Sequence, residues 1–355
     1  MTFPDRSEEK ATANVTLMPD RYPQYDLFVC DVADAVLKDV MPMMEHPFYS
    51  LSKKPETAIR RYEHKGNWVE ITPSVKGLAT IYDKDILIYC ISQVMAKLRA
   101  GEKVSKRVRI ISRDLLMFTN RSTSGREYKA LINALDRLQG TVIRTNIITG
   151  DEEQTEGFGL IDASAIKRKY GLDGRLLWCE VVLSDWVFNA IQHNEVLTLN
   201  RDYFRLSKPI DKRLYELARK HCGSQKEWKV SVSILHKKTG SKGEEKKLRK
   251  SIRAFAKSNH LPDYLVSFDT RTDTVTFTSR ETVQFLDGPN PQKKWDFHLP
   301  STAYKAARKA APRWDVYYLE QEWRAWLSKE NINPRNPERH FEKFCKSWDK
   351  QRMNT

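Results

Sequence analysis

The sequence predicts a mixed α+β protein with two tandem winged helix-turn-helix domains, an extended N-terminal arm and a small all-α C-terminal module. Three observations predict this fold. A short helix, a turn, a longer helix and β-rich sequence follow one another twice along the chain. The two longer helices carry the same apolar stripe at an offset of 117 residues. A segment with prolines and glycine then separates the second copy from a helical tail.

The first 80 residues form the predicted arm and a hairpin. Residues 1–25 are polar and contain proline, which is typical of a loosely structured arm. The stretch IRRYEH-KGN-WVEI predicts a β-hairpin that turns at Gly66–Asn67. Asp83 then begins a long amphipathic helix that ends at Gly101.

The first winged-helix domain is predicted at residues 81–207. Ser112 begins a short helix, and the capping box Ser124-x-x-Glu127 begins a longer helix that runs to Leu138. The β-rich stretches GTVIRTNII, QTEGFGLID and LLWCEVVLS follow. The acidic turn at Gly150–Glu156 after the first of them predicts a wing that points away from DNA, because phosphates would repel it.

The second winged-helix domain is predicted at residues 208–281. A helix over Asp211–His221 precedes a short helix near Val232–Lys238. A second capping box, Ser241-x-x-Glu244, begins a longer helix to about Ser258, and the hairpin YLVSF-DTRTDT-VTFTSR closes the domain.

The two longer helices share one register of apolar residues. The matched pairs are Leu131 with Leu248, Leu135 with Ile252, and Leu138 with Phe255. Capping boxes also occur by chance, and the match ends outside these helices. The shared stripe nevertheless favours a structural duplication over coincidence.

The net charge of +15, from 61 Lys+Arg and 46 Asp+Glu, is unevenly distributed. Residues 1–200 hold 27 basic and 27 acidic side chains, so the whole surplus lies in residues 201–355. Within the neutral part, residues 103–144 carry ten basic and three acidic side chains. A basic surplus can be solubilising surface or a site for a polyanion. Clustering into two blocks favours a polyanion, most simply nucleic acid.

The longer helices are the predicted DNA-binding elements. In the second domain, like charges at helical spacing repel one another, so an anionic partner is favoured over a merely solvated Lys-rich face. In the first domain, Arg and Asn could read base edges. The predicted DNA contacts are Arg121, Arg126, Lys129, Asn133 and Arg137, and then Lys242, Lys246, Lys247, Lys250, Arg253 and Lys257.

The tail consists of a linker at residues 282–300 and a helical module at residues 301–355. Its aromatic side chains alternate with basic ones; they are Trp314, Trp323, Trp326, Phe341, Phe344 and Trp348. This spacing favours the core of a small helical module, and the alternative is a surface that stacks on single-stranded bases.

Catalytic and metal-binding motifs are not found in the sequence. It has no GxxxxGK[ST], no HxH or HExxH, and its five cysteines are never spaced as CxxC. His221–Cys222 lies at a predicted helix end, where the histidine caps carbonyls more readily than it forms a dyad. No apolar run approaches the roughly 20 residues of a membrane helix, and no secretory signal is evident. We expect a non-enzymatic binding protein without cofactor, catalytic residues or metal, located in the cytoplasm.

Many ordered stretches between about Asp26 and Arg280 resemble the replication initiator protein A family of bacterial plasmids. They are MEHPFYSLSK, ITPSVKGLATIYDKDILIYCISQ, RLQGTVIRTNI, FGLID, LSDWVFNAI, EVLTLNRDYFRL, RLYELARKHCG and HLPDYLVSF. The C-terminal WDVYYLEQEWRAWL and HFEKFC are similar to tails of some members and, more weakly, to the DNA-binding module of primosomal helicase-loading proteins.

The resemblance implies a plasmid-encoded replication initiator in a bacterial cytoplasm. Such proteins bind double-stranded origin DNA, often at repeated sites called iterons, help to open it, and recruit the host initiator and the replicative helicase. They form homodimers in equilibrium with monomers and repress their own genes as dimers. The recognition-helix role then falls on Ser124–Leu138 and Glu244–Ser258. Single-stranded DNA is a further expected partner of the C-terminal module, and a purely regulatory repressor is the alternative.

Overall fold

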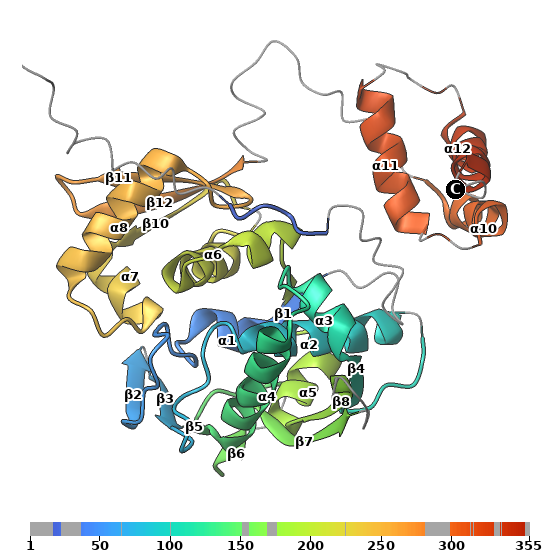
Figure 1. Cartoon of the computed structure of the whole chain (residues 1–355). Helices are drawn as coiled ribbons and strands as arrows, with labels where there is room; N and C mark the ends of the chain where they lie inside the picture. The colour runs from blue at the N-terminus through green and yellow to red at the C-terminus, as the bar shows by residue number, and fades with distance from the viewer. Residues whose placement is uncertain are drawn as a thin grey trace, which may run out of the picture. The chain divides into compact units, whose positions relative to one another are not determined.

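The computed structural model describes residues 17–22, 37–64, 66–99, 101–150, 156–168, 176–223, 225–280, 299–312, 314, 316–329, 334 and 336–351. The chain divides into two compact units, Met1–Thr282 and Val283–Thr355 (Figure 1). None of the helices among the described residues is long and apolar enough to cross a membrane.

The first unit contains helices and strands in both of its halves. The first half comprises β1 (Lys38–Val40), α1 (Met41–Glu45), β2 (Arg60–His64), β3 (Asn67–Thr72), α2 (Lys84–Arg99), β4 (Arg107–Ile111), α3 (Ser112–Phe118), α4 (Gly125–Gly140), β5 (Val142–Thr145), β6 (Phe158–Gly159), β7 (Ile161–Arg168), β8 (Leu176–Leu183), α5 (Asp185–Gln192) and β9 (Val196–Thr198). The second half comprises the 3-10 helix η2 (Arg201–Arg205), α6 (Pro209–His221), β10 (Glu227–Ser231), α7 (Val232–Thr239), α8 (Glu245–Ser258), β11 (Tyr264–Asp269) and β12 (Thr274–Ser279).

The two halves repeat one arrangement. In the first half, α2, β4, α3 and α4 are followed by the hairpin β7–β8, and the sheet order is β4-β8-β7. In the second half, α6, β10, α7 and α8 are followed by the hairpin β11–β12, and the sheet order is β10-β12-β11. In each, the strand before the short helix pairs antiparallel with the last strand of the hairpin.

The apolar register of α4 and α8 is confirmed, but their predicted capping boxes are wrong. All six matched apolar residues are buried. Ser124 is the N-cap of α4 but makes no side-chain cap hydrogen bond. The N-cap of α8 is Glu244, because the Ser241 hydroxyl accepts a hydrogen bond from the backbone N–H of Gly243 instead. Relative to the shared stripe, α4 therefore begins nearly one turn earlier than α8.

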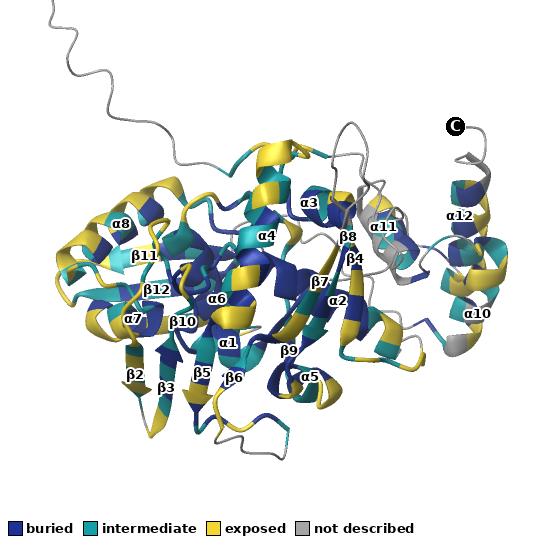
Figure 2. Cartoon of the chain, turned by 60° about the horizontal axis from the view of Figure 1, so that its bottom comes forward, coloured by how far each residue is buried: buried dark blue, intermediate teal, exposed yellow. Residues whose placement is uncertain are grey.

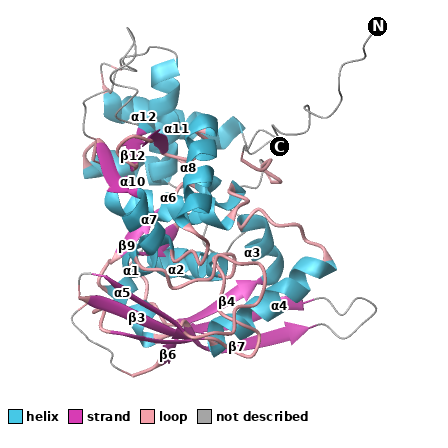
Figure 3. Ribbon diagram, turned by 90° about the vertical axis from the view of Figure 1, so that its left-hand side faces the viewer, coloured by secondary structure: helices cyan, strands magenta, loops and turns pink. Residues whose placement is uncertain are grey.

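The predicted wing of the first half is also wrong. GTVIRTNII forms β5, which pairs with β3 in a separate sheet of order β2-β3-β5-β6. This pairing buries Val69 and Ile71 together with Ile143, which is why β5 joins β3. The hairpin that pairs with β4, the strand before the short helix, is β7–β8. Residues 151–155 of the acidic turn lie outside the described residues. Figure 3 shows β3, β4, β6 and β7 together on one side of α2.

A buried charge cluster joins the two halves. Lys84 Nζ lies 2.6 Å from Asp39 Oδ2 and 3.0 Å from Glu216 Oε1, and all three side chains are at most 1% exposed. Glu216 also accepts hydrogen bonds from the Tyr203 hydroxyl (2.7 Å) and from Arg213 Nη1 (3.1 Å). Burial raises the pKa of Asp39 to about 6, although Lys84 opposes the shift. Helix α6 is thereby fixed against β1 and α2.

The segment Leu17–Tyr22 also connects the two halves, and we call it the strap. The backbone N–H of Met18 donates to the Arg205 carbonyl (2.9 Å), and Arg205 Nε donates to the Met18 carbonyl (2.6 Å). The Tyr22 hydroxyl donates to the carbonyl of Arg121 in the α3–α4 turn (2.9 Å). The expectation of a loosely structured arm is therefore wrong for these residues.

The second unit is a helical module made of α10 (Ser301–Ala310), α11 (Val316–Lys329) and α12 (Pro337–Gln351). Trp323 and Phe341 are fully buried in its core. Trp326 is 37% exposed and stacks on His340, with 5.9 Å between the ring centroids. The expectation of a core is therefore confirmed for Trp323 and Phe341, whereas Trp326 presents part of its indole to solvent.

We expect Lys84→Met to lower the free energy of unfolding of the full chain by about 3–5 kcal/mol, because it removes the ion pair of the buried Asp39 and one of the two cations that contact the buried Glu216. Denaturant unfolding followed by circular dichroism measures the change. Lys229→Met is the matched control, since the Lys229 and Glu227 side chains pair at exposed positions of β10. Equal stability of the two variants would contradict the role of Lys84.

Two histidines, His46 (buried) and His221 (half-buried), predict a loss of stability in acid. Among the residues that the structure describes, His46 Nδ1 and His221 Nε2 have no hydrogen-bond partner, and burial lowers the pKa of each ring from 6.5 to about 4. Such a group stabilises the fold fully above pH 6.5, and this contribution is lost as the pH falls toward 4. The raised pKa of Asp39 acts in the opposite direction below about pH 6, so a comparison with a variant is needed.

We expect the double variant His46→Phe/His221→Phe to lose less stability than the wild type between pH 6.5 and 4. Both proteins keep Asp39, so its titration cancels in the comparison. Urea unfolding at a series of pH values measures the free energy of unfolding of both proteins as a function of pH. If this free energy falls equally in both proteins, the two histidines do not set the acid sensitivity.

Candidate nucleic-acid interface

The outer face of α8 is an unbroken row of cations. Leu248, Ile252 and Phe255 are buried on the opposite face. The exposed cations of α8 are Lys246, Lys247, Lys250, Arg253 and Lys257. Across the part of the chain that the structure describes, none of these five is in a salt bridge, and Arg253 lies over the Phe268 ring at 5.7 Å. Figure 2 shows the exposed outer face of α8.

A brace holds the β11–β12 hairpin against α8. Arg249 donates from Nε to Asp273 Oδ1 (2.9 Å) and from Nη2 to Asp273 Oδ2 (2.8 Å), and it also pairs with Glu245 (2.8 Å). The hydrogen bond from Arg249 holds the pKa of Asp273 below its usual value. The hairpin therefore keeps a fixed position relative to the exposed face of α8.

The tip of this hairpin presents Arg271, which the sequence reasoning missed. Asp269 accepts hydrogen bonds from the backbone N–H of Arg271 (2.9 Å) and from the Thr272 hydroxyl (2.8 Å). These bonds lower the pKa of Asp269, so its charge is used to shape the turn. The Asp-Thr-Arg-Thr-Asp sequence of the turn is the signal that could have identified Arg271.

On α4, the structure separates the predicted contacts into two groups. Arg126 and Lys129 are exposed, and Asn133 accepts a hydrogen bond from Lys76 Nζ (3.1 Å). Arg137 instead forms two hydrogen bonds of 2.7 Å with Asp83, which raise its pKa. Arg126 and Lys129 are therefore the exposed cations of this helix.

Arg121 and Lys242 are held by carboxylates. Arg121 Nη2 lies 2.9 Å from Asp85 Oδ2, whose other oxygen contacts Lys212 Nζ at 2.7 Å. Lys242 Nζ lies 2.9 Å from Glu56 Oε2 but remains 55% exposed. The Arg121 side chain thus takes part in the ion pairs that join the two halves. The Lys242 side chain stays partly accessible to a ligand.

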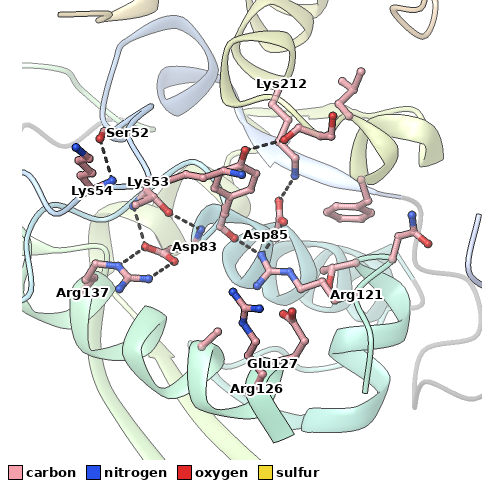
Figure 4. A pocket seen from close by; sticks show the side chains of 18 of the residues that line it. Ser52, Lys53, Lys54, Asp83, Asp85, Arg121, Arg126, Glu127, Arg137 and Lys212 are labelled. Atoms are coloured by element: carbon pink, nitrogen blue, oxygen red, sulfur yellow. Dashed lines mark hydrogen bonds and ion pairs between the residues drawn. The ribbon is translucent and has the colours of Figure 1, made fainter. Parts of the chain in front are cut away.

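A groove of about 530 Å³ lies beside α4, bounded by the start of α2 and by residues 52–55 (Figure 4). Its cationic lining residues are Lys53, Lys54, Lys76, Arg121, Arg126, Arg137 and Lys212, and its acidic ones are Asp83, Asp85 and Glu127. Sequence reasoning missed Lys53, Lys54 and Lys76 because they lie in irregular segments, where no helical period makes a basic face visible.

The start of α6 separates this groove from α8. Leu206, Ser207 and Lys212 line the groove, whereas Lys208 and Asp211 line a cavity of about 220 Å³ against α8. Figures 1 and 2 both show α6 between α8 and α4. The cationic faces of α4 and α8 therefore lie on either side of residues 206–212, at the start of α6.

The possible metal ligands and the cysteine thiols of the described residues have two properties that bear on the site. Within them, no group of three or more His, Cys, Asp or Glu could hold a metal ion. Burial raises the pKa of the thiols of Cys90, Cys179, Cys222 and Cys345, which disfavours the reactive thiolate. The arrangement suits binding of a polyanion.

Comparison with known proteins identifies relatives of this chain. The model of a family described as replication initiator protein A matches residues 38–266. A curated protein of Wigglesworthia glossinidia brevipalpis, called putative replication protein, is 37% identical over 252 residues. The alignment covers 70% of this chain and 91% of that protein.

Two solved structures are similar at low sequence identity. Domains 2 and 3 of RctB match with a TM-score of 0.47 and 14% identity, covering 67% of this chain and 98% of that one. A crystal structure of the Pi initiator protein in complex with iteron DNA matches with a TM-score of 0.40 and 15% identity, covering 57% of this chain and 92% of that one.

Proposed function

The chain belongs to the replication initiator protein A family, and we propose that it binds plasmid origin DNA through two winged helix-turn-helix domains and so initiates replication. The proposal includes no enzymatic step and no cofactor. The observation that carries it is the row of five exposed α8 cations without salt bridges among the described residues. Like charges three and four residues apart repel, and DNA phosphates would supply the opposite charge.

The repeated order of elements supports the winged-helix interpretation. In the second half, α7 and α8 would form the helix-turn-helix, with α8 in the major groove and the hairpin β11–β12 as the wing. Arg249 and Asp273 hold this wing beside α8, and Arg271 at its tip would reach the DNA backbone or minor groove. In the first half, α4 and the hairpin β7–β8 would take the corresponding roles.

Family membership supports the finer steps of the proposal. We infer that the origin sites are repeated, that binding helps to open the duplex, and that the host initiator and replicative helicase are then recruited. A homodimer in equilibrium with the monomer would repress the protein's own gene. A repressor without a replication role is the rival function. Direct repeats beside an AT-rich segment near the gene would favour the initiator, and a lone inverted repeat at the promoter would favour the repressor.

The second unit is proposed to bind single-stranded DNA. Trp326, His340 and Phe344 form a partly exposed aromatic cluster, with 5.9 Å between the centroids of Trp326 and each of the other two rings. Arg339 and Lys343 on α12 are exposed. Aromatic rings beside cations suit stacking of unpaired bases and contact with their phosphates.

We expect Lys250→Ala and Arg253→Ala each to weaken binding to a duplex from the plasmid origin. Each should also reduce the slope of log K against log salt by about 0.9 for a lost phosphate contact. Fluorescence anisotropy at several salt concentrations measures both, and footprinting locates the site. Lys97→Ala, at the far end of α2, is the matched control. If both α8 variants behave like this control, α8 is not the DNA-binding helix.

We expect deletion of residues 290–355 to leave duplex origin binding unchanged and to remove binding of single-stranded DNA. Trp326→Ala in the full chain should weaken single-strand binding, because base–aromatic stacking contributes about 1–3 kcal/mol per base. Ile148→Ala, which truncates another exposed apolar side chain, is the control. Loss of duplex binding on deletion would place the second unit in the primary DNA site.

A further inference from the structure

We propose that the groove beside α4 is a second phosphate-binding site, in which Lys53, Lys54 and Arg126 hold the DNA backbone between the contacts of α4 and α8. This inference rests on the proposed function and extends it to residues outside the two longer helices. The segment that carries the lysines, Ser52–Pro55, lies outside every helix and strand.

The charge balance of the groove favours an anion. Seven cationic and three acidic side chains line it. Two of the acids are already neutralised, Asp83 by Arg137 and Asp85 by Arg121 and Lys212. The remaining acid is Glu127.

Of the four other cations, Lys76 pairs with Asp136, which leaves three for a ligand. No salt bridge within the described ranges involves Lys53, Lys54 or Arg126, and all three are exposed. Figure 4 shows Arg126 on α4 across the groove from the two lysines. A concave site with a surplus of positive charge concentrates its field on a bound anion.

The segment with the two lysines is held in place before any ligand binds. The Ser50 hydroxyl oxygen accepts from the Ser52 N–H (3.0 Å), and the Ser52 hydroxyl oxygen accepts from the Lys54 N–H (3.0 Å). The Ser50 hydroxyl also donates to Glu56 (2.8 Å), which pairs with Arg60 (2.7 Å). Binding a phosphate therefore orders two side chains but not the backbone, which lowers its entropic cost.

The position of the segment between the two longer helices points to DNA. Glu56 pairs with Lys242 in the turn before α8, so the segment is tied to the second half. On its other side, Lys53 shares the groove with Arg126 of α4. A DNA strand that passes from one helix to the other would cross Lys53 and Lys54, with Lys208 beside its path.

The double variant Lys53→Ala/Lys54→Ala tests this inference in the full chain. We expect it to bind the origin duplex more weakly and to reduce the salt slope by about two units, at about 0.9 per phosphate. The ratio of origin affinity to affinity for a scrambled duplex of equal length should not change, because phosphate contacts carry no sequence information. Lys53→Arg/Lys54→Arg should restore the slope.

The matched control is Lys103→Ala/Lys226→Ala, which removes the same charge. Lys103 follows the C-terminal end of α2 and Lys226 that of α6, about 24 and 20 Å along these helices from the ends that border the groove. If the two double alanine variants have equal slopes, the inference is wrong. Competition by free ATP at the groove would likewise overturn it in favour of a small-molecule site.

The two proposals fail in distinguishable ways. If the wild type does not bind the origin duplex above the scrambled one, the proposed function fails and the inference falls with it. If the wild type binds and Lys250→Ala weakens binding while Lys53→Ala/Lys54→Ala does not, only the groove is excluded. Circular dichroism and thermal unfolding of each variant confirm that it is folded.

Discussion

The first unit depends on the burial of one ammonium group, that of Lys84, between the carboxylates of Asp39 and Glu216. A buried charge without a partner is strongly destabilising, so β1, α2 and α6 must meet in one geometry. Helix α6 carries the second half with it, since its apolar side packs into the same core as α8. The ion pairs of Lys84 therefore help to set the distance between the exposed faces of α4 and α8, although neither helix contributes a residue to them.

The carboxylates at the start of α2 decide which cations of the groove are held in ion pairs and which can contact a ligand. Asp83 and Asp85 would repel phosphate if they were unpaired, and they lie in the wall of a basic groove. Arg137, Arg121 and Lys212 neutralise them. Arg121 and Arg137, which the sequence suggested as DNA contacts, thus stabilise the fold. Lys76 pairs with Asp136, so the groove cations without a salt bridge among the described residues are Lys53, Lys54 and Arg126.

The sequence predicted those features of the fold and the site that follow from the helical period. The buried stripe of α4 and α8 and the exposed row from Lys246 to Lys257 follow from helical spacing, and the structure has both. The wing of the first half was wrong because β5 pairs with β3, about 75 residues away, and no local pattern encodes such a pairing. The partners of Arg121 and Arg137 lie 36 and 54 residues away in sequence, which hid their ion pairs.

The strap has a consequence for the order of folding. Its hydrogen bond from Arg205 to Met18 spans 187 residues, and that from Tyr22 to Arg121 spans 99. Contacts of such separation carry a large loop-closure entropy and form only after the surfaces that receive them exist. On the ribosome, residues 17–22 emerge before both halves, so they are made first and dock last. Closure of the strap thus marks the completion of the first unit.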